Sequence, residues 1–228
     1  MSGPTPTDDP ASLRVRDADG NWITPGIILQ AYAARMFPMA DTRKGRFSWF
    51  RPEERAVITW DVNLPVSRLE ASSPLLGKPS WKIPDSLRKV MKREPYRITF
   101  DQAFPAVIAA CADRDSTWIS LGIERLYTAL HQLGHAHSVE AWSPAGELVG
   151  GCYGLVVGGV FCGESMFHRA DDAAKICIVH LVARLRARGF SVLDCQQMTP
   201  HMARFGAYEI SDDDYAHLLA ATPPASPW

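Results

Sequence analysis

The order of apolar and polar positions in this 228-residue chain predicts one long helix, over residues 172–188. Ile176, Val179 and Val182 recur there at helical spacing, and neighbouring apolar residues widen the face that they share. Gly189 follows at the position where a glycine commonly ends a helix. Asp101 is the expected N-cap of a helix that reaches residue 111. Further helices are expected at 27–36, 84–93, 123–133, 200–205 and 213–219.

Apolar runs of strand length predict a sheet around these helices. The segments 148–157 and 160–164 flank Gly158-Gly159, which is typical of a β-hairpin. Other strands are expected at 96–100, 137–142 and 191–193, and strand-like segments flank the turn at 52–55. A series of strands, then a long helix, then a strand that ends in polar residues predicts an α+β fold with a mostly antiparallel sheet flanked by helices.

Local composition predicts three parts along the chain. Residues 1–20 are rich in Pro, Ser, Thr and Asp, which is typical of a loosely ordered arm. Prolines and a glycine within 72–84 favour an extended linker. We therefore expect a small N-terminal lobe over 21–80 and a catalytic domain over 81–228.

The overall composition excludes several classes of protein. With 46% apolar residues the chain is not wholly disordered, and no apolar run has the length of a membrane span. The first 20 residues lack the pattern of a secretion signal, so we expect a cytoplasmic protein. The five cysteines contain no C-x-x-C pair, which favours reduced thiols and no structural zinc. His135 and His137 lack a third ligand at recognisable spacing, so no metal site is expected.

The charges nearly cancel, with 24 Lys and Arg against 25 Asp and Glu, which excludes a protein that is basic throughout. A local basic face is nevertheless predicted near residues 82–97. In a helix there, Arg88 and Lys92 lie one turn apart, as do Lys89 and Arg93, and Arg97 follows. Such a face suits contact with nucleic-acid phosphates, although an ordinary solvated helix has the same pattern.

Two polar clusters follow apolar strands and are candidates for chemistry. Glu164 either lies at the rim of the sheet or is buried with a partner, for example the ammonium group of a ligand. Strand periodicity places Asp194 and Gln196 on one face and Cys195 on the other. A carboxylate beside an amide can orient an amine and accept its proton, but a turn leading into the helix at 200–205 would also explain them.

Several short strings recur in a recognisable order within residues 27–217. They are TWI at 117–119, LGHAHSVE at 133–140, LVGG at 148–151, FCGESMF at 161–167, DCQ at 194–196 and FGA at 205–207. Their wording and order closely resemble the leucyl/phenylalanyl-tRNA–protein transferases of the bacterial N-degron pathway.

The resemblance implies a specific activity. Enzymes of this family transfer Leu, Phe and Met from aminoacyl-tRNA to the N-terminal α-amino group of proteins that begin with Arg or Lys. The reaction is aminolysis of the tRNA ester, and the product passes to the ClpS/ClpAP degradation machinery. The resemblance also implies a GNAT-like acyltransferase domain beside a small N-terminal lobe, no cofactor, no metal, no contact with membranes and a monomeric chain.

The resemblance also assigns roles to residues. Asp194 and Gln196 match a catalytic pair, and Glu164 matches a carboxylate near the aminoacyl ammonium group. Trp49 and Trp118 match aromatic residues that stack on the terminal adenosine. The basic face, Arg88 to Arg97, matches the region that meets the tRNA body. The aminoacyl side-chain pocket is expected to be lined by Cys152, Phe161, Gly163, Ser165, Met166, Ile178, Leu181 and Leu193.

Two other interpretations fit parts of the sequence. An acetyl-CoA-dependent N-acetyltransferase would require a glycine-rich loop for the pyrophosphate before its main helix. The stretch 165–172 contains no glycine and has two acidic residues. A non-catalytic RNA-binding or degron-binding module would keep the basic face and the pocket, but it would not need Glu164, Asp194 and Gln196 together.

Overall fold

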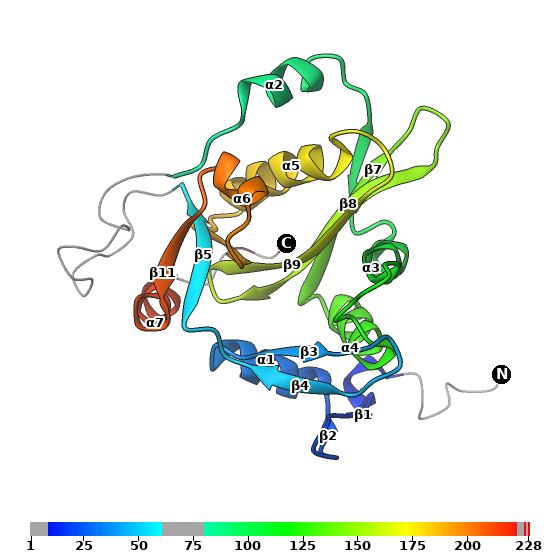
Figure 1. The fold of residues 1–228 in the computed structure, drawn as a ribbon, viewed down its shortest axis with the longest axis vertical. Helices are drawn as coiled ribbons and strands as arrows, with labels where there is room; N and C mark the ends of the chain where they lie inside the picture. The colour runs from blue at the N-terminus through cyan, green and yellow to red at the C-terminus, as the bar shows by residue number, and fades with distance from the viewer. Residues whose placement is uncertain (1–8, 61–79, 223–225, 227) are drawn as a thin grey trace.

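The computed structural model of the protein describes residues 9–60, 80–222, 226 and 228 (Figure 1). Its centre is a seven-stranded sheet with the strand order β11-β5-β10-β9-β8-β7-β6. β9 and β10 are parallel, and the other neighbouring pairs of this sheet are antiparallel. The strands are β5 (Glu54–Thr59), β6 (Arg97–Phe100), β7 (Ala136–Trp142), β8 (Leu148–Val157), β9 (Val160–His168), β10 (Val192–Gln196) and β11 (Tyr208–Ser211).

The sheet is therefore mixed, and the protein has a mixed α/β architecture. The sequence prediction of a mostly antiparallel sheet missed the parallel pair. That pair exists because α5 (Ala173–Ala187) follows β9 and crosses over the sheet before β10 begins. The hairpin predicted across Gly158-Gly159 is confirmed, with β9 extending further than expected, to His168.

Helices cover both faces of the sheet (Figure 1). α5 packs on β7 and β8, whereas α3 packs on β8 and β9. Neighbouring residues of β8, Cys152 and Tyr153, belong to separate apolar clusters, as expected when successive side chains point to opposite faces. Among the described residues, no helix is long and apolar enough to span a membrane. The other helices are α1 (Pro25–Ala33), α2 (Asp85–Met91), α3 (Phe104–Ala112), α4 (Leu121–Gln132), α6 (Pro200–Arg204) and α7 (Asp212–Ala221).

Asp101, the residue expected to cap α3, contacts β7 instead. α3 begins at Phe104, after Ala103, rather than directly after Asp101. Asp101 instead adopts a positive φ of 58°. Its carboxylate accepts a hydrogen bond from the backbone N–H of Ser138 at 2.8 Å and lies 2.8 Å from Nδ1 of His137. The predicted N-cap is therefore wrong, because the carboxylate turns toward β7.

The N-terminal region is more ordered and more integrated than its composition predicts. Within the predicted arm, residues 9–20 include the 3-10 helix η1 (Pro10–Ser12) and the strand β1 (Val15–Arg16). Leu13 and Val15 pack against the apolar core, which holds this segment against α4. Residues 1–8, and most of the predicted linker, lie outside the described residues.

The predicted lobe over 21–80 also contributes to the large sheet. It holds α1, β2 (Trp22–Ile23) and the antiparallel pair β3 (Phe37–Ala40) and β4 (Phe47–Phe50). β5 lies within the same range, yet it pairs with β10 and β11 near one edge of the seven-stranded sheet. The boundary proposed near residue 80 thus does not separate two sheets.

Candidate active site

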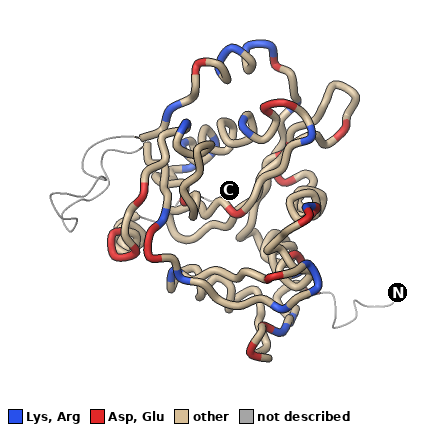
Figure 2. Tube along the Cα trace, viewed as in Figure 1, with Lys and Arg blue, Asp and Glu red and all other residues tan. Residues whose placement is uncertain are grey.

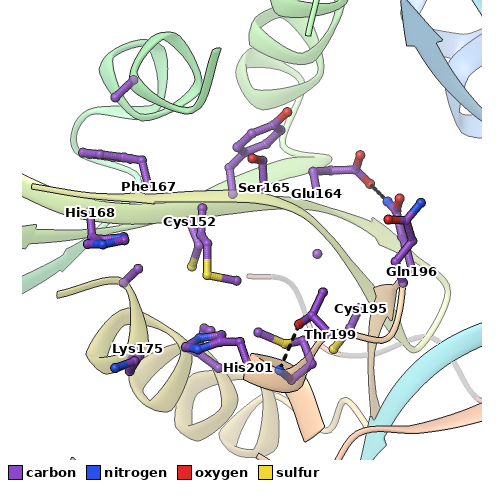
Figure 3. Close-up of a pocket in the computed structure, with 18 of the residues that line it drawn as sticks. Cys152, Glu164, Ser165, Phe167, His168, Lys175, Cys195, Gln196, Thr199 and His201 are labelled. Carbon is purple, nitrogen blue, oxygen red and sulfur yellow. Dashed lines mark hydrogen bonds between the residues drawn. The ribbon is translucent and has the colours of Figure 1, made fainter. Parts of the chain in front are cut away.

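A cavity opens where β9 and β10 separate. The two strands pair only over residues 160–162 of β9, although β9 continues to His168. In β10 the register shifts between Asp194 and Gln196, and Gln196 has a positive φ of 60°. This bulge bends the strand away from β9. The resulting cavity has a volume of about 1000 Å³ and is bordered by β8, β9, β10, α5 and α6 (Figure 3).

Glu164 and Gln196 face each other across the opening between the strands (Figure 3). Nε2 of Gln196 donates a hydrogen bond to Oε1 of Glu164 at 2.8 Å. The hydroxyl of Tyr127 donates to Oε2 of Glu164 at 3.4 Å, and it is itself hydrogen-bonded to the hydroxyl of Tyr32. Glu164 is therefore a partnered carboxylate inside the protein rather than a residue at the sheet rim.

The surroundings of Glu164 make it a weak acid. Burial raises the pKa of its carboxyl from 4.5 to about 7, because charge is unfavourable away from water. The hydrogen bonds from Tyr32, Gln196 and Tyr127 act in the opposite direction, and the charge of Asp194 adds to the rise. Near neutral pH this group can therefore exist as an acid or as a carboxylate.

Asp194 supports Gln196 from behind and does not line the cavity. One of its oxygens, Oδ1, accepts a hydrogen bond from the backbone N–H of Gln196 at 2.7 Å. The other, Oδ2, accepts from the Arg55 guanidinium at 3.0 Å, and both side chains are almost completely buried. The expectation that Asp194 and Gln196 share a face opposite Cys195 is wrong. The bulge breaks the alternation, so that Cys195 and Gln196 both line the cavity.

Arg55 was not among the residues predicted from the sequence. Its guanidinium also donates to the carbonyl oxygen of Arg35 at 2.6 Å and lies 4.4 Å from the ring centre of Tyr215. Burial by itself lowers the pKa of this group, but the nearby Asp194 raises it overall, so the arginine stays charged. The available signal was a basic residue at the start of the apolar run of β5, which implies a buried partner.

Most of the residues predicted to hold the aminoacyl side chain line the cavity. Phe161 and Leu181 do not, because they pack into the apolar core on the α5 side of the sheet, where Phe161 stacks on Trp228. Polar side chains that the prediction did not include also line the cavity, and one of them lies on α6. The predicted residues that line the cavity are Cys152, Gly163, Ser165, Met166, Ile178 and Leu193, and the additional polar ones include Arg114, His168, Arg169, Lys175, Thr199 and His201.

The two tryptophans expected near the adenosine lie in different places. Trp118 lines the cavity, and its backbone carbonyl accepts a hydrogen bond from the backbone N–H of Ala40 in β3 at 3.1 Å. Trp49 lies on β4, where it packs edge-to-face on Phe47, and it is not among the lining residues. The geometry therefore brings one of the two tryptophans to the cavity.

The predicted basic face lies on and after α2, away from the centre of the sheet (Figure 2). Arg88, Lys89, Lys92, Arg93 and Arg97 are all exposed. Arg88 lies 3.9 Å from Asp85, and the Arg97 guanidinium lies over the Trp142 ring. The remaining three form no ion pair with any described residue and are accessible to an anionic partner.

The histidine pair considered for a metal is not brought together. His137 instead lies near Asp101 and His131, the one group of potential ligands found among the described residues. Nδ1 of His131 lies 2.9 Å from the carbonyl oxygen of Ala136. A carbonyl oxygen only accepts hydrogen bonds, so this nitrogen carries a proton and cannot bind a metal. The group is a hydrogen-bonded cluster.

Known proteins identify the family. The model of the family described as leucyl/phenylalanyl-tRNA protein transferase matches residues 75–220. Two proteins named leucyl/phenylalanyl-tRNA–protein transferase are each 43% identical to this chain. The one from Rubrobacter xylanophilus aligns over 87% of this chain and 94% of its own length. The one from Herpetosiphon aurantiacus aligns over 86% and 93%.

A solved structure, that of L-PGS from Bacillus licheniformis, aligns over 70% of this chain and 45% of its own, with a TM-score of 0.38 and 12% identity. The family model and the two sequence relatives place the chain among the aminoacyltransferases. It belongs to the leucyl/phenylalanyl-tRNA–protein transferase family.

Proposed function

We propose that this protein transfers Leu, Phe and Met from aminoacyl-tRNA to the α-amino group of proteins that begin with Arg or Lys. The observation that carries the proposal is the pair formed by Gln196 and Glu164 inside the cavity, with Asp194 fixed behind it. Membership of the transferase family supports the same reaction.

Glu164 is the group that would bind the ammonium of the aminoacyl ester. Its carboxylate lies on the cavity wall, where burial disfavours the negative charge. A bound ammonium group would compensate for the lost hydration and would favour the ionised form of Glu164. Tyr127 and Gln196 hold the two carboxylate oxygens from different sides and so restrict the carboxylate to one orientation. The ester carbonyl would then lie close to Gln196.

Gln196 would orient the attacking amine. Its Nε2 is committed to Glu164, which leaves the amide oxygen free to accept an N–H from the acceptor. The amine nitrogen forms a bond to the ester carbon, the bond from that carbon to the ribose oxygen breaks, and the ribose hydroxyl departs with a proton. Asp194 is fully buried against Arg55, so we assign it the positioning of Gln196 rather than direct uptake of the proton.

The cavity wall would select the amino acid. Cys152, Met166, Ile178 and Leu193 give it an apolar surface. Such a surface accepts Leu, Phe and Met and excludes polar side chains, with discrimination of about 1–3 kcal/mol per methylene. Cys152 has a small side chain, which leaves extra room in this part of the pocket.

The remaining features of the family are part of the same proposal. Trp118 stacks on the terminal adenosine, with Trp49 nearby, and the basic face on α2 meets the tRNA body. The mixed sheet with its parted parallel pair supports a GNAT-like catalytic domain beside the N-terminal lobe. The activated ester needs no cofactor. The protein acts as a cytoplasmic monomer, and its products pass to the ClpS/ClpAP degradation machinery.

A transfer assay tests the proposal. The protein is mixed with an acceptor that begins with Arg and with either radiolabelled Leu-tRNA or radiolabelled acetyl-CoA. We expect label to enter the acceptor only from tRNA, and to be lost in Gln196→Ala and Asp194→Ala but not in the surface control Gln132→Ala. Transfer from acetyl-CoA alone would contradict the proposal in favour of an N-acetyltransferase. Binding of tRNA or acceptor without any transfer would indicate a non-catalytic module.

A further inference from the structure

A second cavity, of about 660 Å³, adjoins the mouth of the first. The two cavities share Ala110, Asp113, Arg114 and Arg169 along their common border. The second cavity, which we call the arginine groove, runs between the end of α3 and the loops that follow β3 and β9. Its lining is completed by Arg43, Ala106, Ala109, Ala112, Thr117 and Leu148.

Positive charge dominates the lining of the arginine groove. Arg114 and Arg169 are exposed; the Arg114 guanidinium donates to the carbonyl oxygen of Met166, and the Arg169 guanidinium lies over the Phe167 ring. Neither forms an ion pair with a described carboxylate. Arg43 is held in place by Glu124 and by the carbonyl oxygen of Ile119. Asp113 is the single acidic residue in the described lining. Guanidinium groups are well suited to phosphate oxygens, because their planar fork can donate two hydrogen bonds at once.

The positive charge continues beyond the groove. The turn between β3 and β4 carries Lys44 and Arg46 close to Arg43 in the chain, and Arg46 is exposed. Figure 2 shows Lys and Arg positions at this turn, at the end of α3 and after β9, along one side of the molecule. This surface is distinct from the basic face on α2, and the roles assigned from the sequence do not include it.

The lining of the groove favours a polynucleotide backbone over stacked bases. Apart from its charged residues it consists of four alanines of α3 with Thr117 and Leu148, and the described lining contains no aromatic side chain. Bases on single strands typically stack on aromatic residues, whereas phosphates require only a positive groove of sufficient width. An aromatic platform adjoins the groove at Trp118, which follows Thr117 in the chain but lines the first cavity.

We propose that the arginine groove binds the phosphodiester backbone of the single-stranded acceptor end of aminoacyl-tRNA. The proposal rests on the proposed function, because it places the terminal adenosine at Trp118 and directs the preceding phosphates toward Arg114 and Arg169. An acceptor protein that begins with Arg or Lys is a poor occupant of the same groove, since like charges would repel it.

Three donors of increasing length test the proposal. They are Leu-adenosine, which has no phosphodiester, a Leu-charged CCA trinucleotide, and full-length Leu-tRNA. KM is measured for each donor with wild-type protein and with Arg114→Gln and Arg169→Gln. The matched control is Arg186→Gln on α5, an exposed arginine outside both cavities. Thermal melting verifies that each variant is folded.

We expect each groove variant to raise KM about five-fold for the trinucleotide and for tRNA, as is typical of one exposed charge-assisted interaction. KM for Leu-adenosine rises less than KM for either longer donor, because Leu-adenosine has no phosphodiester, although both arginines also border the first cavity. The slope of log KM against log salt falls by about 0.7 for each phosphate that the variant no longer neutralises. Lys92→Gln, directly after α2, raises KM only for full-length tRNA, which separates the two basic surfaces.

Other outcomes would overturn the proposal. An equal rise in KM for Leu-adenosine would mean that the arginines shape the aminoacyl or nucleoside site. A rise in KM for the acceptor alone would assign the groove to the acceptor protein, and unchanged constants would exclude a role in binding. Failure of the proposed function itself is distinguishable, because the wild-type protein would then transfer nothing from any of the three donors.

Discussion

The sharpest prediction concerns the protonation of Glu164. Burial raises the pKa of its carboxyl from 4.5 to about 7, and only the ionised form attracts the ammonium group of the donor. The affinity for an aminoacyl donor should therefore be lost as the pH falls through 7. At pH 6 about one-tenth of the free protein has an ionised Glu164, so the apparent Kd should weaken about ten-fold. A carboxyl with an ordinary pKa would leave Kd almost unchanged at that pH.

Binding of a non-reactive donor measures this effect without interference from the acceptor amine. The ligand is an adenosine that carries Leu through a 3′-amide in place of the ester. Its Kd is determined by calorimetry between pH 5.5 and pH 7.0, where its own amino group, with a pKa of about 7.7–8.0, stays mostly protonated. The Glu164→Gln variant should bind weakly at every pH and should show no pH dependence. Glu147→Gln, an exposed glutamate in a turn, is the matched control and should behave like the wild type.

Stability gives an independent check on the same group. Because the folded state prefers the neutral form of Glu164, its ionisation costs stability as the pH rises from 4.5 through 7. The interval between these two pKa values corresponds to about 3 kcal/mol. Glu164→Gln should therefore gain stability over the wild type at pH 8 and little at pH 5. A Kd that is flat with pH in the wild type, or a pH dependence that persists in Glu164→Gln, would refute the reasoning.

Three further predictions concern the buried ion pair, the cavity wall and the packing within the sheet. Arg55→Met should lower the free energy of unfolding in urea by about 3–5 kcal/mol, because it leaves the Asp194 carboxylate buried and unpaired. Adding Asp194→Asn should recover part of that loss. Strictly additive effects of the two substitutions on the free energy of unfolding would contradict a direct pair. Cys152→Met should lower the ratio of kcat/KM for Phe over Leu about ten-fold by narrowing the cavity, and an unchanged ratio would mean that Cys152 does not limit side-chain size. Gly154→Ala places its Cβ in a steric clash with the Cys162 carbonyl oxygen and should lower the free energy of unfolding in urea by about 1–3 kcal/mol. Gly26→Ala, whose Cβ meets nothing closer than 3.8 Å, is the control and should be neutral or stabilising.

Local patterns predicted the elements of the fold well. The long helix α5, its end before Gly189 and the hairpin of β8 and β9 all follow from short-range signals. Each depends on residues a few positions apart, because helical spacing, capping and tight turns are local properties of the chain. The misplaced N-cap at Asp101 has the complementary cause. Its carboxylate has stronger partners on β7, more than thirty residues away in the chain.

The candidate site was predicted in part. Glu164, Gln196 and six of the eight pocket residues lie at the cavity, and the two that do not, Phe161 and Leu181, belong to the core beside it. Apolar residues of a strand or a helix look alike in sequence whether they line a cavity or fill a core. Only the packing of the neighbouring elements separates these two cases.

By itself the sequence determined the family, most helices and strands, and the residue types available for chemistry. The tertiary structure decided which of these residues lie in the cavity and which residues they contact. The bulge in β10 places Gln196 in the cavity and Asp194 behind it. Arg55, which pairs with Asp194, lies 139 residues earlier in the chain. The arginine groove forms where the end of α3 lies beside loops from other parts of the chain. These arrangements join segments far apart in the chain. Their energies depend on burial and charge compensation across the folded core, which no local pattern encodes.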